Sequence, residues 1–133
     1  MMQRAIGVFC LCLSSALALG AGLSAGLAAG LNPHWAHVPA KDHAQLNPLA
    51  GKAEAVAAGA LLYGDHCQQC HHADARGDGH KRPSLRSDSI KAATDGDIQW
   101  FLRQGDLAHG MPSWSSLPQA QRWQIIAYLR SIQ

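Results

Sequence analysis

The residues best suited to chemistry lie in one pentapeptide, Cys67-Gln68-Gln69-Cys70-His71. The C-x-x-C-H pattern is typical of haem c attachment, because two thiols three positions apart can form thioethers with the two vinyl groups on one porphyrin edge. The histidine directly after the second cysteine then lies beneath the ring as an axial iron ligand. We therefore predict one covalently bound haem c, held by Cys67 and Cys70 and ligated by His71.

Two other chemistries use the same types of residue. A redox-active C-x-x-C pair is typically found in a βαβ context, and strand-forming residues are scarce in this chain. A structural zinc site needs four ligands, and without a second C-x-x-C pair only His66, His72 or His80 could complete it. A haem-free dithiol or zinc module is therefore the alternative to haem attachment.

The second axial ligand of the iron follows by elimination. The chain has three methionines, and only Met111 lies beyond the N-terminal 31 residues. Gly110 before it allows the backbone to approach the ring closely, and Pro112 after it stiffens the loop. A thioether ligand favours ferrous iron and raises the reduction potential, so we predict Met111 as the sixth ligand. His109 is the rival and would give a bis-histidine iron of lower potential.

An iron with two protein ligands leaves no open position for a substrate. This predicts one-electron transfer by a carrier that is not an enzyme, since no general acid, base or nucleophile is required. If Met111 leaves the iron, the alternative is a haem-based sensor or small-ligand binder. The charge balance of 11 Lys+Arg against 9 Asp+Glu, without a basic stripe, argues against nucleic-acid binding.

The elements that must position these residues are predicted to be helices. Beyond residue 31 the chain has only two Val, five Ile and one Thr, and these are the residues that favour sheets. Helical patterns cover residues 53–63, 95–104 and 118–132. Gly105 is expected to end the second helix. Three short helices make a thin core for about eighty residues, which a large apolar prosthetic group would fill.

Two of these helices carry an apolar stripe. In the first helix the spacing predicts that one face is buried, made of Ala53, Val56, Ala57, Ala60 and Leu61. Gly59 interrupts this helix at a cost of about 1 kcal/mol relative to Ala, which suggests that another backbone passes close by. The stripe of the last helix is Ile125, Tyr128, Leu129 and Ile132.

The N-terminal part has the features of an export signal. Residues 1–31 carry one charge, Arg4, and the 27 uncharged residues that follow it would extend about 40 Å as a helix, enough to cross a hydrocarbon core of about 30 Å. They are predicted to form either a signal peptide or a retained membrane anchor, with the rest of the chain outside the cytoplasm. Residues 32–51 contain Pro33, Pro39 and Pro48 and are predicted to be an extended linker.

Residues 52–133 resemble the monohaem class I cytochromes c of bacteria. The resemblance rests on the C-x-x-C-H motif, the Gly59/Tyr63 pair, and the segment 123–130, which is similar to the family's terminal helix. It implies an all-α cytochrome c fold of three or more short helices wrapped around one covalent haem, here preceded by an N-terminal hydrophobic helix. It also implies that the Pro83 carbonyl accepts a hydrogen bond from His71 and that Leu85 lines the haem pocket. His72 departs from the pattern, because many relatives have Gly there.

The expected protein is an exported electron carrier with a His/Met-ligated haem c. Its partners would be redox proteins, with a dehydrogenase or quinol-oxidising complex as donor and a terminal oxidase as acceptor. We expect it on the periplasmic side of the inner membrane, anchored by residues 5–31, or soluble in the periplasm if the leader is cleaved.

Overall fold

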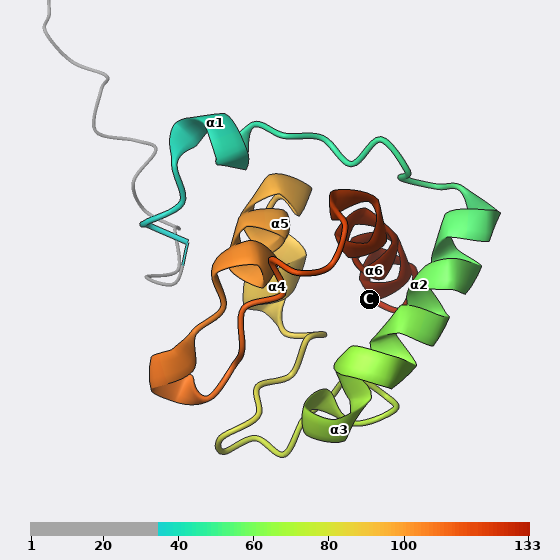
Figure 1. The fold of residues 1–133 in the computed structure, drawn as a ribbon. Helices are drawn as coiled ribbons and strands as arrows, with labels where there is room; N and C mark the ends of the chain where they lie inside the picture. Colours follow the sequence, from blue (N-terminus) through green and yellow to red (C-terminus); the bar gives the residue numbers. More distant parts are fainter. Residues whose placement is uncertain (1–34) are drawn as a thin grey trace, which may run out of the picture. The chain divides into compact units, whose positions relative to one another are not determined.

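The computed structural model describes residues 35–133, which are helical and contain no strand (Figure 1). Its elements are α1 (Ala40–His43), α2 (Ala53–His66), α3 (Gln68–His71), α4 (Asp88–Ala92), α5 (Asp95–Gln104), the 3-10 turn η1 (Leu107–His109) and α6 (Gln119–Ser131). This confirms the all-α prediction for the described part of the chain. None of its helices is long and apolar enough to span a bilayer, and the predicted hydrophobic helix within residues 1–31 lies outside the described residues.

The three predicted helices are present with nearly the expected bounds. For α5 the bounds agree because its end signals are local. The Thr94 hydroxyl accepts a hydrogen bond from the Asp97 amide, and the Asp97 carboxylate accepts one from the Thr94 amide, which together form a capping box. Gly105 ends the helix with a φ of +70°. The single turns α1, α3, α4 and η1 were not predicted.

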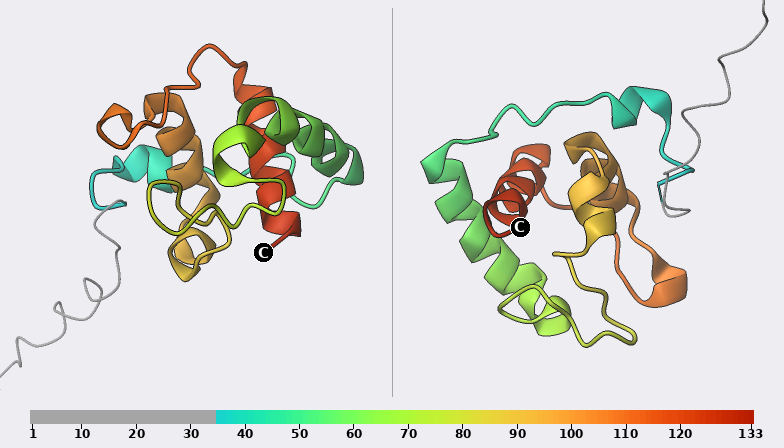
Figure 2. Two further views of the ribbon diagram at one scale, coloured as in Figure 1. Left: turned by 90° about the horizontal axis from the view of Figure 1, so that it is seen from below. Right: turned by 180° about the vertical axis from the view of Figure 1, so that it is seen from behind.

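Helix α6 lies between α2 and the α4–α5 pair (Figures 1 and 2). It meets α2 at Gly59, where a built Cβ would lie 1.9 Å from the Gln124 carbonyl oxygen. The expectation that another backbone passes close to Gly59 is therefore confirmed. Tyr63 packs one turn further along, with its ring centroid 5.3 Å from that of Tyr128.

The predicted buried stripe of α2 is wrong. The buried residues are Ala55, Gly59 and Tyr63, whereas Leu61 is 74% exposed. The reason is that the close approach of α6 selects the face containing glycine, and a helix with so many alanines has no strong apolar stripe to oppose it. The apolar stripe predicted for α6 is confirmed in part, since Ile125 and Leu129 are buried and Tyr128 and Ile132 are partly buried.

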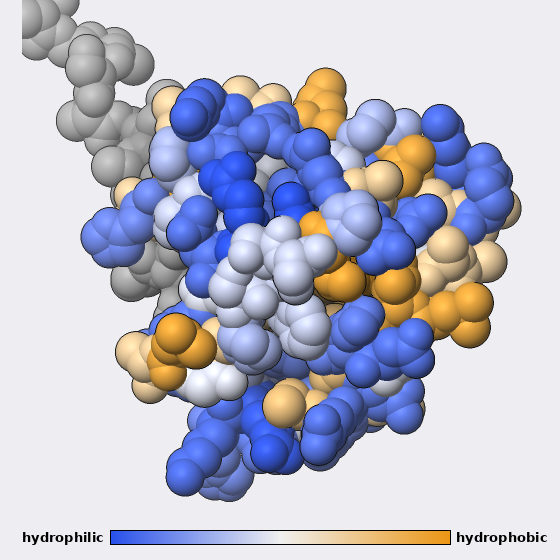
Figure 3. All heavy atoms as spheres, viewed as in Figure 1, coloured by the Kyte–Doolittle hydropathy of each residue, from blue (hydrophilic) through white to orange (hydrophobic). Residues whose placement is uncertain are grey.

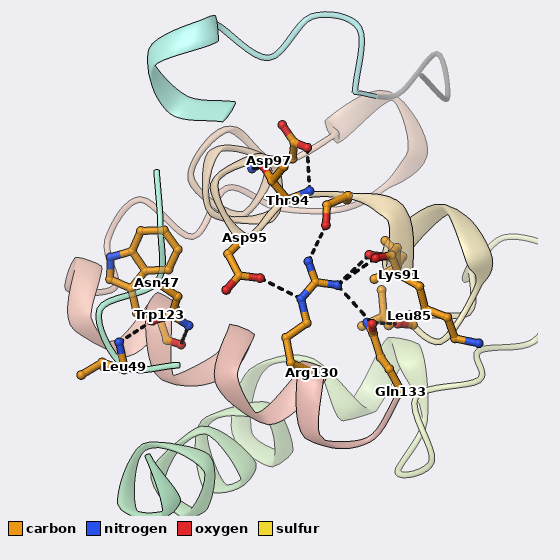
Figure 4. A network of polar contacts seen from close by, with 12 residues as sticks. Asn47, Leu49, Leu85, Lys91, Thr94, Asp95, Asp97, Trp123, Arg130 and Gln133 are labelled. Atoms are coloured by element: carbon orange, nitrogen blue, oxygen red, sulfur yellow. Dashed lines mark hydrogen bonds and ion pairs between the residues drawn. The ribbon is translucent and has the colours of Figure 1, made fainter. Parts of the chain in front are cut away.

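The C-terminal end of α6 is fastened to the α4–α5 junction by Arg130 (Figure 4). Its guanidinium donates to Asp95 Oδ1 at 2.7 Å and to the backbone carbonyls of Ile90 and Ala93. The guanidinium thus binds carbonyls at the end of α4 and the carboxylate at the start of α5 with one side chain. This contact holds the scaffold together on the side of α6 away from α2.

The structure differs from the extended linker predicted for residues 32–51. From residue 35 on, this segment contains helix α1 and packs against the rest of the domain. Trp35 is buried, and the buried Asn47 side chain donates to the Trp123 carbonyl at 3.0 Å. Asp42 pairs with Arg103 at 3.3 Å. The prolines interrupt the helical periodicity of this segment. Its packing depends instead on single contacts with residues distant in the chain, and such contacts leave no periodic pattern in the sequence.

Candidate functional site

The C-x-x-C-H residues form one compact turn at the C-terminal end of α2. The Cys67 carbonyl accepts hydrogen bonds from the amides of Cys70 and His71, at 3.1 and 2.9 Å. Cys67 is buried and Cys70 is exposed. Burial raises the pKa of the Cys67 thiol to about 12, and the neighbouring Cys70 adds to this shift. Cys67 precedes the short helix α3 as its N-cap, and Cys70 and His71 lie within α3, so the two thiols and the imidazole stand on one turn, as attachment along one edge of a ring requires.

The His71 ring is oriented by a backbone carbonyl. Its Nδ1 lies 3.0 Å from the carbonyl oxygen of Pro83, and because a carbonyl only accepts, Nδ1 must be the protonated nitrogen. Burial lowers the pKa of His71, while the bond to Pro83 raises it in part. The imidazole is thus favoured in the neutral form with Nε2 unprotonated, which is the form that binds a metal.

The loop that carries Pro83 is shaped by its own backbone. The Asp78 carboxylate accepts hydrogen bonds from the amides of His80, Lys81 and Arg82, and these bonds lower the pKa of Asp78. Gly77 has a φ of +63°, and a Cβ there would lie 2.0 Å from the Arg82 carbonyl oxygen. The result is a tight turn that brings Pro83 back over the C-x-x-C-H helix.

His72, the departure from the family pattern, has a backbone conformation with φ +65° and ψ 165°. This region is almost restricted to glycine, so the non-glycine residue is strained. The Tyr63 hydroxyl donates to the His72 carbonyl at 2.7 Å and helps to hold this conformation. Burial raises the pKa of Tyr63 well above its ordinary value, so the hydroxyl is protonated and able to donate.

Met111 lies in the connection between α5 and α6, residues 105–118, which we call the Met111 loop. Backbone hydrogen bonds close this loop near its start. Asp106 and Met111 exchange two backbone hydrogen bonds of 2.8 and 2.9 Å. At Gly105 a Cβ would lie 2.6 Å from the backbone of Pro112 and Ser113. Met111 is half-buried and packs against the core, whereas the His109 side chain is 73% exposed and pairs with Asp106 at 2.7 Å.

The Met111 loop and the C-x-x-C-H segment lie on neighbouring parts of the domain. The Trp114 ring packs on the ring of His66, with centroids 5.0 Å apart, directly before Cys67. A pocket of about 390 Å³ is lined by His80, Lys81, Ala108 and His109, which come from the loop before Pro83 and from the segment before Met111. In the view of Figure 3, hydrophobic side chains are visible in a hollow near the centre of the face.

These residues fit a haem c. The site supplies two thiols on one turn, a neutral imidazole with a fixed ring, and a half-buried thioether on a loop that packs beside them. Leu85 is half-buried and packs against the core, as a pocket residue would, and its amide donates to the Ala75 carbonyl at 2.9 Å. Within residues 35–133 no group of three or more His, Cys, Asp or Glu side chains is arranged to hold a metal ion.

The sequence interpretation missed Arg122, whose side chain is buried behind the Met111 loop. A signal for it was present. Arg122 lies three residues before Ile125 and seven before Leu129, so it extends the apolar stripe of the last helix by one turn. Arginine at such a position is normally assigned to the solvent face, and this is why the pattern did not reveal it.

Comparison with known proteins identifies the family of the domain. No curated protein matches the chain. A family model matches residues 54–129, from the start of α2 to the last turn of α6, and its description is Cytochrome C oxidase, cbb3-type, subunit III. The matched segment spans more than half of the chain, which therefore belongs to this family of extracytoplasmic c-type cytochrome domains that bind haem c covalently and transfer electrons.

Proposed function

We propose that this protein is an exported one-electron carrier whose haem iron is ligated by His71 and Met111. The observation that carries the proposal is the hydrogen bond of 3.0 Å between His71 Nδ1 and the Pro83 carbonyl. It commits one ring nitrogen to the backbone and leaves Nε2 as the only nitrogen of that ring available to the iron. A hydrogen-bond acceptor on the other nitrogen of a ligating histidine fixes the orientation of the ring and increases the basicity of the ligand nitrogen.

The residues around the site supply attachment and rigidity. When bound, haem c supplies reversible one-electron chemistry at its iron. Cys67 and Cys70 would form the two thioethers, and Leu85 would contribute to the apolar pocket. The tight turn at Asp78 and the hydrogen-bonded base of the Met111 loop restrict movement of both ligand-bearing segments. Little rearrangement is then required when the oxidation state changes.

Met111 is a better candidate for the sixth ligand than His109. The thioether is half-buried and packs against the core, whereas the His109 ring points largely into solvent and is paired with Asp106. A sulfur ligand would raise the reduction potential relative to bis-histidine ligation. A high potential suits a carrier that delivers electrons to the oxidising end of a respiratory chain.

The chain is proposed to act between membrane respiratory complexes. The family description names a subunit of an oxidase, which favours a terminal oxidase as the electron acceptor. A dehydrogenase or a quinol-oxidising complex would be the donor. In this proposal residues 1–31 are a signal peptide or membrane anchor and residues 52–133 are the cytochrome c domain, against which residues 35–51 pack.

The proposal is tested by Met111→Ala with His109→Ala as the matched control in the same loop. Met111→Ala is expected to abolish the iron–sulfur charge-transfer band of the ferric protein, to lower the reduction potential and to let the ferrous iron bind carbon monoxide. His109→Ala should retain the band and resist carbon monoxide. Loss of the band in His109→Ala but not in Met111→Ala would overturn the ligand assignment, and a wild-type protein that binds carbon monoxide readily would favour a sensor.

A further inference from the structure

Arg122 is a buried cation without an acidic partner. Its residue is 7% exposed, and none of the ion pairs among residues 35–133 includes it. Burial lowers the pKa of its guanidinium, and the charge of Arg103 lowers it further. Burying a charge is costly unless it is fully hydrogen-bonded. The groups that accept hydrogen bonds from the Arg122 guanidinium therefore indicate which segments the side chain holds in place.

Those partners are one side chain and two backbone carbonyls. Arg122 Nε donates to Gln99 Oε1 at 2.9 Å, which ties the guanidinium to α5. Nη1 donates to the carbonyl of Trp114 at 3.2 Å and to the carbonyl of Leu117. Both carbonyls belong to the segment that follows Met111, so the guanidinium holds the downstream end of the Met111 loop.

The same segment is connected to the haem-attachment turn. The Trp114 amide donates to the Leu102 carbonyl at 2.8 Å, and its ring packs on His66 beside Cys67. Ser113 Oγ donates to the Arg103 carbonyl at 2.6 Å. Trp114 is thus fixed by α5 through its amide, by α6 through its carbonyl and by the end of α2 through its ring. Any displacement of Trp114 would move the Met111 loop relative to Cys67.

We propose that Arg122 is a positioning residue that keeps the Met111 sulfur within reach of the haem iron. It acts through the carbonyls of Trp114 and Leu117 and touches neither the iron nor the ring. The inference rests on the proposed His71/Met111 ligation. Arg130 provides a natural comparison, because it also lies on α6 and also binds backbone carbonyls, but those carbonyls belong to the α4–α5 junction.

The test compares Arg122→Met with Arg130→Met in the full haem-loaded chain. The Arg122 substitution leaves the carbonyls of Trp114 and Leu117 without their charged donor. One hydrogen bond to a charged group corresponds to at least about a tenfold change in an equilibrium, so the sulfur-detached fraction should rise about tenfold or more. The expected readouts are a weaker iron–sulfur band and an increase of about tenfold in the rate of carbon monoxide binding. Arg122→Lys keeps the charge but not the fork, and it should give a smaller change in the same direction.

Arg130→Met is expected to lower thermal stability while leaving the band and the carbon monoxide rate within about twofold of the wild type. The proposal is overturned if Arg122→Met keeps both at wild-type values, if Arg130→Met changes them equally, or if both Arg122 variants lose the helical fold, since the residue would then be a general folding determinant. Failure of the underlying ligation is distinguished in the wild type, which would lack the band altogether.

Discussion

At the crossing of α2 and α6, we expect Gly59→Ala to lower the stability of the protein, whereas helix propensity alone predicts an increase. Replacing glycine by alanine inside a helix normally stabilises a protein by up to about 1 kcal/mol. At Gly59, however, the new Cβ would lie 1.9 Å from the Gln124 carbonyl oxygen, 2.6 Å from its carbonyl carbon and 2.9 Å from Tyr128 Cβ. The obstacle is mainly backbone of α6, which cannot move aside as a flexible side chain can.

The size of the effect follows from the displacement that is required. To reach even 3.0 Å, α6 must move away from α2 by roughly 1 Å. A radial gap of about 0.5–1 Å forfeits about a quarter to a half of the dispersion energy of the atoms concerned. The buried Tyr63 packs against Tyr128 at this interface, and overpacking of a core typically costs about 1–3 kcal/mol. We expect Gly59→Ala to destabilise the haem-loaded protein by about 2 kcal/mol, even after the gain in propensity.

Gly64 supplies the matched control on the same helix. A Cβ there would meet only the Gln68 Oε1 atom, at 3.8 Å, so Gly64→Ala should stabilise by about 0.5–1 kcal/mol. Urea unfolding of both variants measures the difference, and thermal unfolding should show Gly59→Ala melting about 8–16 °C below the wild type. If Gly59→Ala proved as stable as Gly64→Ala, the close α2–α6 crossing would be refuted.

Two further predictions concern the loop that follows the C-x-x-C-H motif. His72→Gly should raise the unfolding free energy by about 1 kcal/mol in urea titrations, because it relieves the positive-φ strain; a loss of stability would show that the His72 side chain contributes more than the strain costs. The pKa of folded Asp78 is lowered by the amides of His80 and Arg82, so its contribution to stability is present above the ordinary value of 3.8 and is lost as the pH falls through the lower folded value. Asp78→Ala should therefore be less stable than the wild type at pH 7, with a deficit that shrinks below about pH 4 in pH-dependent unfolding; a deficit independent of pH would contradict this assignment.

Local signals explain the parts of the fold and site that the sequence predicted. The attachment motif occupies five consecutive residues, and α5 is bounded by a capping box at Thr94 and a glycine at its end. Tertiary contacts explain the rest. The buried face of α2 is selected by the approach of α6 at Gly59, and Leu61 is left exposed although it is the more hydrophobic residue.

Sequence patterns could not predict the packing of residues 35–51 or the burial of Arg122, for a similar reason. Each depends on hydrogen bonds between residues distant in the chain, such as Asn47 to the Trp123 carbonyl and Arg122 to Gln99. Periodicity reports which residues share a face, but it does not report which carbonyls need a donor. The ligand pair His71 and Met111 remains a prediction that a spectrum must test.

A redox titration of the purified full chain, monitored by its absorption spectrum, tests most directly whether His71 and Met111 both ligate a haem iron. Ligation by His71 and Met111 predicts a single reversible one-electron transition of low-spin, six-coordinate iron, with an iron–sulfur charge-transfer band in the oxidised protein. A high-spin, five-coordinate iron in the reduced protein, or an oxidised spectrum without the sulfur band, would contradict it.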